Sequence, residues 1–234
     1  MDERLRKLER EARDGDPAKR ARYLLECVRA GRFERGRLQL AAYLGDPGAR
    51  QALGEDAPII PRDLALWIDG LAAWENVEVV ARSCAALCRM TVEFWRDMDP
   101  TDECGALSLL TRFEVWILAP CEVTNERLIA AAVPVWQTQR ETKLPPLGAA
   151  TTALLASASL ARDEGRALKK LLWEELGQGL QTQRLLTDPA RRAAIAVREC
   201  LGRSMGPDPD AAIRAAIARE LIPWVLGEGD PLRG

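Results

Sequence analysis

The chain contains no histidine among its 234 residues. This absence excludes Ser-His and Cys-His nucleophilic pairs, histidine-ligated zinc and iron sites, and the commonest general base. The glycine patterns that cradle phosphate groups, the Walker pattern and Gly-x-Gly-x-x-Gly, are missing as well. Enzyme chemistry would therefore have to use carboxylates, lysine, tyrosine or an isolated thiol. We expect a protein that is not an enzyme and carries no cofactor.

The sequence also lacks the signals of β-structure. No stretch alternates apolar and polar residues with period two, and no Asn-Gly or Asp-Gly turn joins two apolar runs. Apolar residues instead recur every three or four positions, as one face of a helix requires. One stripe comprises Val77, Val80, Cys84, Leu87, Cys88, Thr91, Trp95 and Met98, opposite Glu78, Arg82, Arg89, Glu93 and Arg96. Another comprises Leu109, Leu110, Phe113, Trp116 and Ile117. The pattern predicts an all-α protein of about ten to twelve amphipathic helices.

Asp-Pro pairs mark the expected helix starts. Aspartate at the N-cap accepts a hydrogen bond from a free amide, and proline at the first helical position has no amide to leave unpaired. Such pairs occur at Asp16-Pro17, Asp46-Pro47, Asp99-Pro100, Asp188-Pro189 and Asp208-Pro209, and again at Asp230-Pro231. The first two follow Gly15 and Gly45 and are 30 residues apart. This spacing is near that of a helix-pair repeat.

Glycine, proline and acidic residues in the segment 54–61 indicate a boundary. We expect an N-terminal helical subdomain at 1–54, a linker at 55–61, a main helical domain at 62–226 and a flexible tail at 227–234. The sequence leaves open whether the helices form an open array or a closed bundle.

Targeting and membrane signals are absent. No apolar stretch precedes a small-residue cleavage site near the N-terminus, so we expect a cytoplasmic protein. Residues 144–161 carry no charge, but two prolines and many Ala, Ser and Thr indicate a buried helix and not a membrane span. The net charge is −2, and basic and acidic residues alternate near the N-terminus, so a nucleic-acid partner is not expected. Arginine outnumbers lysine by 28 to 5, which is typical of a bacterium with a GC-rich genome.

Two stretches resemble known helical proteins. Residues 208–219 (DPDAAIRAAIAR) and 188–194 (DPARRAA) are similar to helices of HEAT repeats. The two starts are 20 residues apart, too close for two complete HEAT units, so the likeness implies a degenerate HEAT-like array or an irregular bundle. Residues 37–53 (RLQLAAYLGDPGARQAL) and 114–120 (EVWILAP) resemble bacterial helical proteins labelled as immunity proteins. Neither likeness carries a residue with a transferable function.

The six cysteines are Cys27, Cys84, Cys88, Cys104, Cys121 and Cys200. We interpret them as buried, reduced thiols. Cys84 and Cys88 share a helical face, which would allow a metal site with Cys104 and Cys121. Their position on the apolar stripe favours core packing, and we expect no metal.

Acidic residues cluster at Asp97, Asp99, Asp102 and Glu103, and again at Glu174-Glu175. Two carboxylates serve as acid and base only when a cleft holds them at set distances. Helix capping accounts for the first group, and a solvated helix face for the second.

Seven tryptophans are present, and most lie on the apolar stripes. If any is exposed at a partner interface, Trp67, Trp74 or Trp173 is the expected one, because interface hot spots favour tryptophan. The sequence predicts a non-catalytic module that binds a protein partner through a helical surface. Two alternatives stay open: an immunity-type protein that neutralises a toxin, and a helical bundle that binds a small molecule or uses carboxylates or a thiol as an enzyme.

Overall fold

The computed structural model describes residues 3–74, 77–103, 105–121, 123–124, 126–128, 130–132, 135, 190–199 and 201–233. Across these residues the regular structure is helical and no strand occurs, with eleven helices in this part of the chain. The predicted all-α class is therefore confirmed. The buried helix expected at 144–161 lies outside the described residues.

The chain divides into two compact units. Unit 1 comprises Met1–Asp63 together with Ala218–Gly234, and unit 2 comprises Leu64–Ile217. The first boundary follows the linker expected at 55–61. The predicted division into 1–54 and 62–226 does not include the C-terminal segment in the first unit. No local sequence pattern indicates that a segment far along the chain packs against the N-terminal helices.

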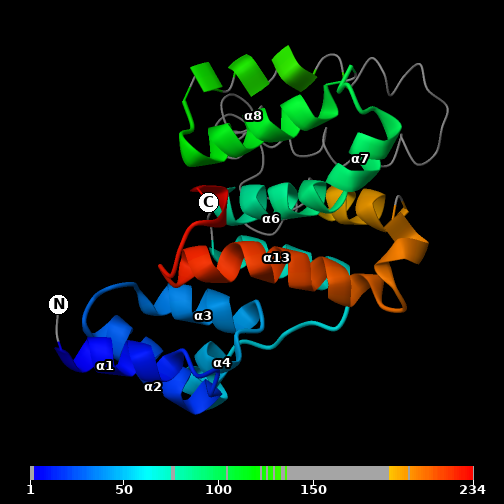
Figure 1. Cartoon of the computed structure of the whole chain (residues 1–234). Coiled ribbons are helices and arrows are strands. Elements are labelled where there is room, and N and C mark those ends of the chain that lie inside the picture. Colours follow the sequence, from blue (N-terminus) through cyan, green and yellow to red (C-terminus); the bar gives the residue numbers. More distant parts are fainter. Residues whose placement is uncertain are drawn as a thin grey trace, which may run out of the picture. The chain divides into compact units, whose positions relative to one another are not determined.

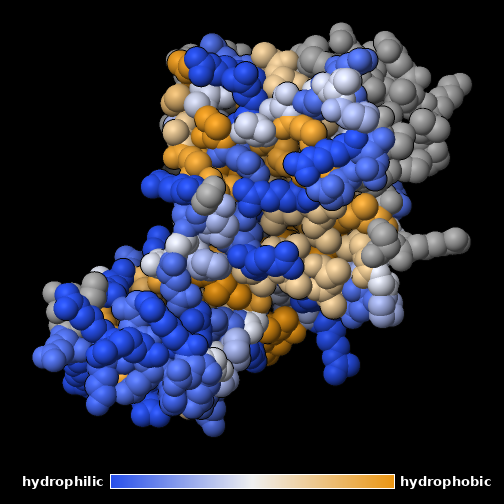
Figure 2. Space-filling view, in the orientation of Figure 1, coloured by the Kyte–Doolittle hydropathy of each residue, from blue (hydrophilic) through white to orange (hydrophobic). Residues whose placement is uncertain are grey.

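Unit 1 begins with four short helices, which Figure 1 draws in blue and cyan. They are α1 (Glu3–Ala12), α2 (Pro17–Arg29), α3 (Arg35–Tyr43) and α4 (Pro47–Leu53), followed by the 3₁₀ turn η1 (Gly54–Asp56). Helix α2 packs against both α1 and α4, and α3 packs against α4. The alternating charges of α1 face solvent, so the visible face of this unit is hydrophilic in Figure 2. Its core includes Leu5, Leu24, Cys27, Leu38, Ala41 and Ala49.

The two Gly-Asp-Pro motifs start α2 and α4 with the same backbone conformation. Gly15 and Gly45 have φ of +77° and +99°, a left-handed region that glycine enters without strain. Asp16 accepts a hydrogen bond from the amide of Ala18 at 2.8 Å, and Asp46 accepts one from Ala49 at 2.7 Å. Both predicted helix starts are therefore confirmed. The two aspartates differ in burial, since Asp16 is exposed and Asp46 is 5% exposed.

Asp46 is buried because Arg20 of α2 covers it. The Arg20 Nε donates to Asp46 Oδ2 at 3.0 Å, and its Nη1 lies 2.9 Å from Oε1 of Glu228. Burial favours the neutral guanidine, but the hydrogen bonds that Arg20 donates to Glu228 and Asp46 outweigh it and raise the pKa of Arg20. Gly48 makes this contact sterically feasible, because a Cβ atom there would lie 2.5 Å from the Arg20 Cγ.

The last residues of the chain, which the sequence predicts to be a flexible tail at 227–234, belong to unit 1. Helix α13 (Pro209–Val225) is followed by Glu228, which pairs with Arg20, and by the 3₁₀ turn η4 (Pro231–Arg233). The Asp230 carboxylate accepts from the amide of Leu232 at 3.1 Å, so this Asp-Pro pair also begins a helical turn. The tail has few apolar residues, and its contacts are ionic, which an apolar-stripe criterion does not detect.

Unit 2 contains α5 (Leu64–Leu71), the 3₁₀ turn η2 (Ala72–Trp74), α6 (Val77–Met90), α7 (Val92–Met98), α8 (Ala106–Leu118), a helical segment at 190–199, the 3₁₀ turn η3 (Gly202–Met205) and the first residues of α13. Helix α6 packs along α8, and α7 contacts both, as Figure 1 shows in green. Arg191 joins the 190–199 segment to α5, with its Nε 3.4 Å from Oδ1 of Asp69. Arg198 forms an ion pair with Asp210 at the start of α13.

The single helix expected over 77–98 is two helices, interrupted at Thr91. The Thr91 hydroxyl donates to the carbonyl of Cys88 at 2.7 Å, a local side-chain bond that competes with helix continuation. The stripe residues from Val80 to Trp95 are buried as predicted. Arg82, expected on the outer face, is only 1% exposed, and its Nη2 lies 2.9 Å from Oε1 of Glu78.

No helix in the described part of the chain combines the length and the apolar character needed to cross a bilayer.

Candidate functional site

Helix α8 has one face in the core of unit 2 and one face in solvent. Its predicted inner stripe is confirmed, since Leu109, Leu110, Phe113, Trp116 and Ile117 are all buried. The rings of Phe113 and Trp116 stack with centroids 5.8 Å apart. Arg89 of α6 fixes one flank of the helix through its Nε, 2.6 Å from Oε1 of Glu114. The opposite side therefore presents Ser108, Thr111, Arg112 and Val115 to solvent.

The start of α8 differs from the one that the sequence predicts. Asp99 ends α7 and does not begin a helix at Pro100, so the Asp99-Pro100 prediction is wrong. The capping carboxylate belongs to Asp102, which accepts from the amides of Leu107 at 2.8 Å and Ser108 at 2.9 Å. Asp102 has φ of +54°, a conformation that aspartate tolerates better than most residues. The acidic cluster thus caps a helix as expected, but the capping residue is Asp102 and not Asp99.

A second wall stands opposite the outer face of α8, and it is built by the segment that follows. The chain turns at Cys121, where the backbone amide of Cys121 donates to the Thr124 hydroxyl at 3.0 Å. That hydroxyl lies 2.9 Å from the carbonyl of Ala119 and donates to it. Leu128 is fully buried and anchors the segment, while Arg127, one residue earlier, is exposed.

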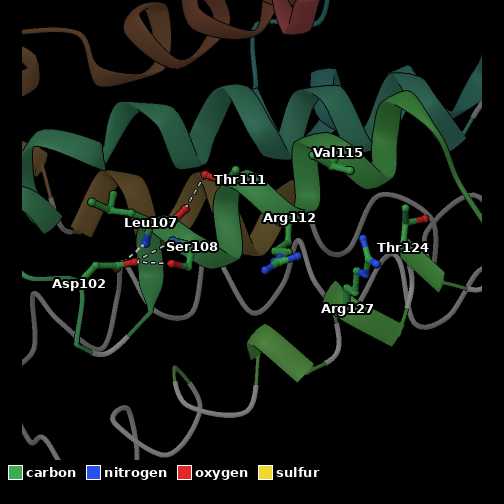
Figure 3. Close-up of a pocket in the computed structure, with 8 residues that line it drawn as sticks. All are labelled: Asp102, Leu107, Ser108, Thr111, Arg112, Val115, Thr124 and Arg127. Carbon is green, nitrogen blue, oxygen red and sulfur yellow. Dashed lines mark hydrogen bonds between the residues drawn. The ribbon is translucent and has the colours of Figure 1, made fainter.

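The two walls enclose an open pocket of about 370 Å³. Figure 3 shows the side chains of Arg112 and Arg127 extending from the two walls into the space between them. The pocket is lined by Asp102, Leu107, Ser108, Thr111, Arg112, Val115, Thr124 and Arg127. We call this feature the α8 pocket.

The α8 pocket has two cationic groups that the described residues do not neutralise. No described carboxylate forms an ion pair with Arg112 or Arg127, whereas the arginines Arg20, Arg82 and Arg89 each contact one. Apolar side chains are exposed on the same two elements as the arginines. Val115 is 48% exposed, and Val123, next to Thr124 in the chain, is 53% exposed. Arginine next to exposed apolar side chains is a composition that protein interfaces favour.

Cys121 is exposed at the start of the second wall, which corrects the expectation that this thiol is buried. Its sulfur lies 3.4 Å from the hydroxyl oxygen of Thr124. The contact with the Thr124 side chain, together with the amides of Thr124 and Val123 and the charge of Arg127, lowers the pKa of the Cys121 thiol. Cys27, Cys84 and Cys88 are buried, as predicted.

We expect Cys121 to react with iodoacetamide faster than Cys27, Cys84 or Cys88. Thiolate is the reactive form, and a lowered pKa places the half-maximal rate at a lower pH than for free cysteine. Peptide mass spectrometry of the folded protein after short exposures at several pH values measures both effects. Thr124→Val removes the largest stabilising contact and should shift the rate profile to higher pH. Equal labelling of Cys121 and Cys84 in the folded protein would contradict this assignment.

The tryptophans expected at an interface do not form one exposed surface. Trp67 of α5 is 1% exposed, and the guanidinium of Arg214 lies over its ring at 4.8 Å from the centroid. The expectation of exposure is therefore wrong for Trp67. Trp74 is half-buried and lies in η2, which directly follows α5. Trp173 lies outside the described residues.

No group of three or more cysteine, aspartate or glutamate side chains is placed to hold a metal ion within the described part of the chain. Cys84 and Cys88 belong to the core of α6, with exposures of 0% and 1%. Cys104, Cys200 and Glu174-Glu175 lie outside the described residues. The sequence pattern does not predict a role for Arg112 or Arg127, because a single arginine on the outer face of a helix carries no sequence signal by itself.

Comparison with known proteins gives no further assignment: no family model, no curated protein and no solved structure matches this chain.

Proposed function

We propose that this chain is a non-catalytic protein-interaction module, and that the α8 pocket and its apolar rim are its partner-binding surface. The observation that carries the proposal is the pair of arginines, Arg112 and Arg127, which line one pocket and form no ion pair with any described carboxylate. Val115 and Val123 are exposed on the same two elements. Arginine provides both charge and a flat contact area, and it is enriched among interface residues with large binding energies.

The position of the two walls favours recognition of a protein surface. The pocket is open to solvent, and one of its walls is the outer face of α8, whose other face is fixed in the core. A rigid element of this kind presents its side chains with little loss of entropy on binding. The expected partner surface is acidic and contains apolar residues, because it has to complement both the guanidinium groups and the two valines.

The test is capture of partners from a lysate of the source organism with three immobilised proteins. These are the wild type, Arg112→Glu with Arg127→Glu, and a matched control with Arg6→Glu and Arg22→Glu. Arg6 and Arg22 are exposed on α1 and α2, so the control carries the same charge change on another surface. We expect a protein that the wild type and the control enrich and that the Arg112→Glu, Arg127→Glu variant loses.

Circular dichroism has to show that all three proteins retain the same helical content. Quantitative mass spectrometry then compares the enriched proteins, and the candidate is purified and mixed with each variant. A partner retained equally by all three proteins would place binding elsewhere. A pocket that binds a small metabolite and no protein would instead support the small-molecule alternative and overturn the proposal.

A further inference from the structure

The donors and charges inside the α8 pocket specify which chemical group it takes. The Ser108 hydroxyl donates to Asp102 Oδ2 at 2.7 Å, and the Thr111 hydroxyl donates to the carbonyl of Leu107 at 3.0 Å. The Thr124 hydroxyl is likewise engaged with a backbone carbonyl. The hydroxyl protons of the pocket are thus already used. The guanidinium groups of Arg112 and Arg127 are the lining donors that remain for a ligand.

The formal charge of the pocket favours a monoanion. Two guanidinium groups give +2, and the carboxylate of Asp102, which also lines the pocket, gives −1. A single carboxylate therefore balances the local charge. A phosphate dianion would exceed it, and Asp102 would repel its two charges more strongly than the single charge of a carboxylate. Planar carboxylates also match the fork of guanidinium donors.

The rest of the lining describes the neighbours of that carboxylate. Leu107 and Val115 contribute apolar side chains to the same pocket. A group that places its charge between the arginines would set adjacent atoms against these residues. An acidic residue flanked by aliphatic residues has this composition.

We infer that Arg112 and Arg127 together hold the side-chain carboxylate of an aspartate or glutamate that is flanked by aliphatic residues in the protein partner. This inference rests on the proposed function, because it names the group that the partner inserts into the α8 pocket. Both arginines are required, since each supplies charge from one wall of the pocket.

The test uses short peptides in place of the unidentified partner. The arginine Nε–Hε resonances of ¹⁵N-labelled protein are followed while acetyl-Leu-Asp-Leu-amide, acetyl-Leu-Asn-Leu-amide or inorganic phosphate is added at constant ionic strength. The single variants Arg112→Gln and Arg127→Gln assign the two resonances. We expect the Asp peptide to shift both resonances and to leave those of Arg6 and Arg22 in place, while the Asn peptide shifts none. Each single variant should weaken binding of the Asp peptide by about tenfold or more.

Three results would overturn the inference: no shift with the Asp peptide, an equal shift with the Asn peptide, or tighter binding of phosphate than of the Asp peptide. The outcome is separable from that of the proposed function. If a captured partner depends on the α8 pocket but the Asp peptide does not bind, the carboxylate inference is rejected and the proposed protein-interaction function is kept. If the Asp peptide shifts the resonances but no protein is captured, the α8 pocket still binds a carboxylate and the proposed protein-interaction function is rejected.

Discussion

Replacing Phe113 with alanine is expected to destabilise unit 2 by about 4 kcal/mol, because the change removes a buried aromatic ring and leaves a cavity. Phe113 is 1% exposed and stacks against Trp116 on the inner face of α8. The same face fixes the direction of Arg112, the preceding residue in the chain. Urea unfolding followed by tryptophan fluorescence measures the change, since Trp67, Trp74, Trp95 and Trp116 all belong to unit 2.

Phe113→Leu is the matched control, because it keeps an apolar side chain of comparable size and should cost about 1.5 kcal/mol or less. The leucine variant should also retain partner binding, whereas the alanine variant should bind the partner more weakly, because α8 is less firmly held in the core. A loss below about 1 kcal/mol for Phe113→Ala would mean that this side chain does not hold α8 in the core.

The second large effect is expected in unit 1, where Asp46→Ala should cost about 3 kcal/mol. The change removes the N-cap of α4 and also the buried carboxylate that binds Arg20. Glu228 still pairs with Arg20 from the partly exposed side, so the loss stays below that of a fully buried pair. Urea unfolding by far-UV circular dichroism measures the total, and hydrogen exchange over residues 17–53 localises it.

The repeated motif supplies the control for this prediction. Asp16 caps α2 through a backbone amide of the first turn, as Asp46 caps α4, but its side chain is exposed. Asp16→Ala should therefore cost about 1 kcal/mol, the contribution of a cap alone. Equal losses for the two substitutions would show that the contact between Arg20 and Asp46 adds no stability.

Residue patterns predicted the elements of this fold better than their ends. The stripe from Leu109 to Ile117 and the Gly-Asp-Pro starts of α2 and α4 are found as expected, because periodicity and capping are local properties. The interruption at Thr91 was not foreseen, because it depends on one side-chain bond to the carbonyl of Cys88. Arg82 also differs from its prediction, since the surrounding elements cover a face that a single helix would leave to solvent.

The candidate site could not be read from the sequence for a related reason. Arg112 and Arg127 are 15 positions apart, and only the turn at Cys121 brings their walls to one pocket. The turn uses the Thr124 hydroxyl as a capping group, a signal of one residue that many sequences contain without this consequence. The preference of interfaces for tryptophan instead predicts exposure of Trp67. This side chain is buried in the core of unit 2, with the guanidinium of Arg214 over its ring. Exposure at an interface depends on tertiary packing, and residue type alone does not determine it.

The central claim is that the α8 pocket binds a protein partner, and isothermal titration of the captured partner tests it most directly. Wild-type protein and the Arg6→Glu, Arg22→Glu control should bind with the same dissociation constant. Arg112→Glu with Arg127→Glu should weaken binding by at least about 30-fold, the effect of losing one interface hot spot or more. An unchanged dissociation constant for the folded Arg112→Glu, Arg127→Glu variant would contradict the claim.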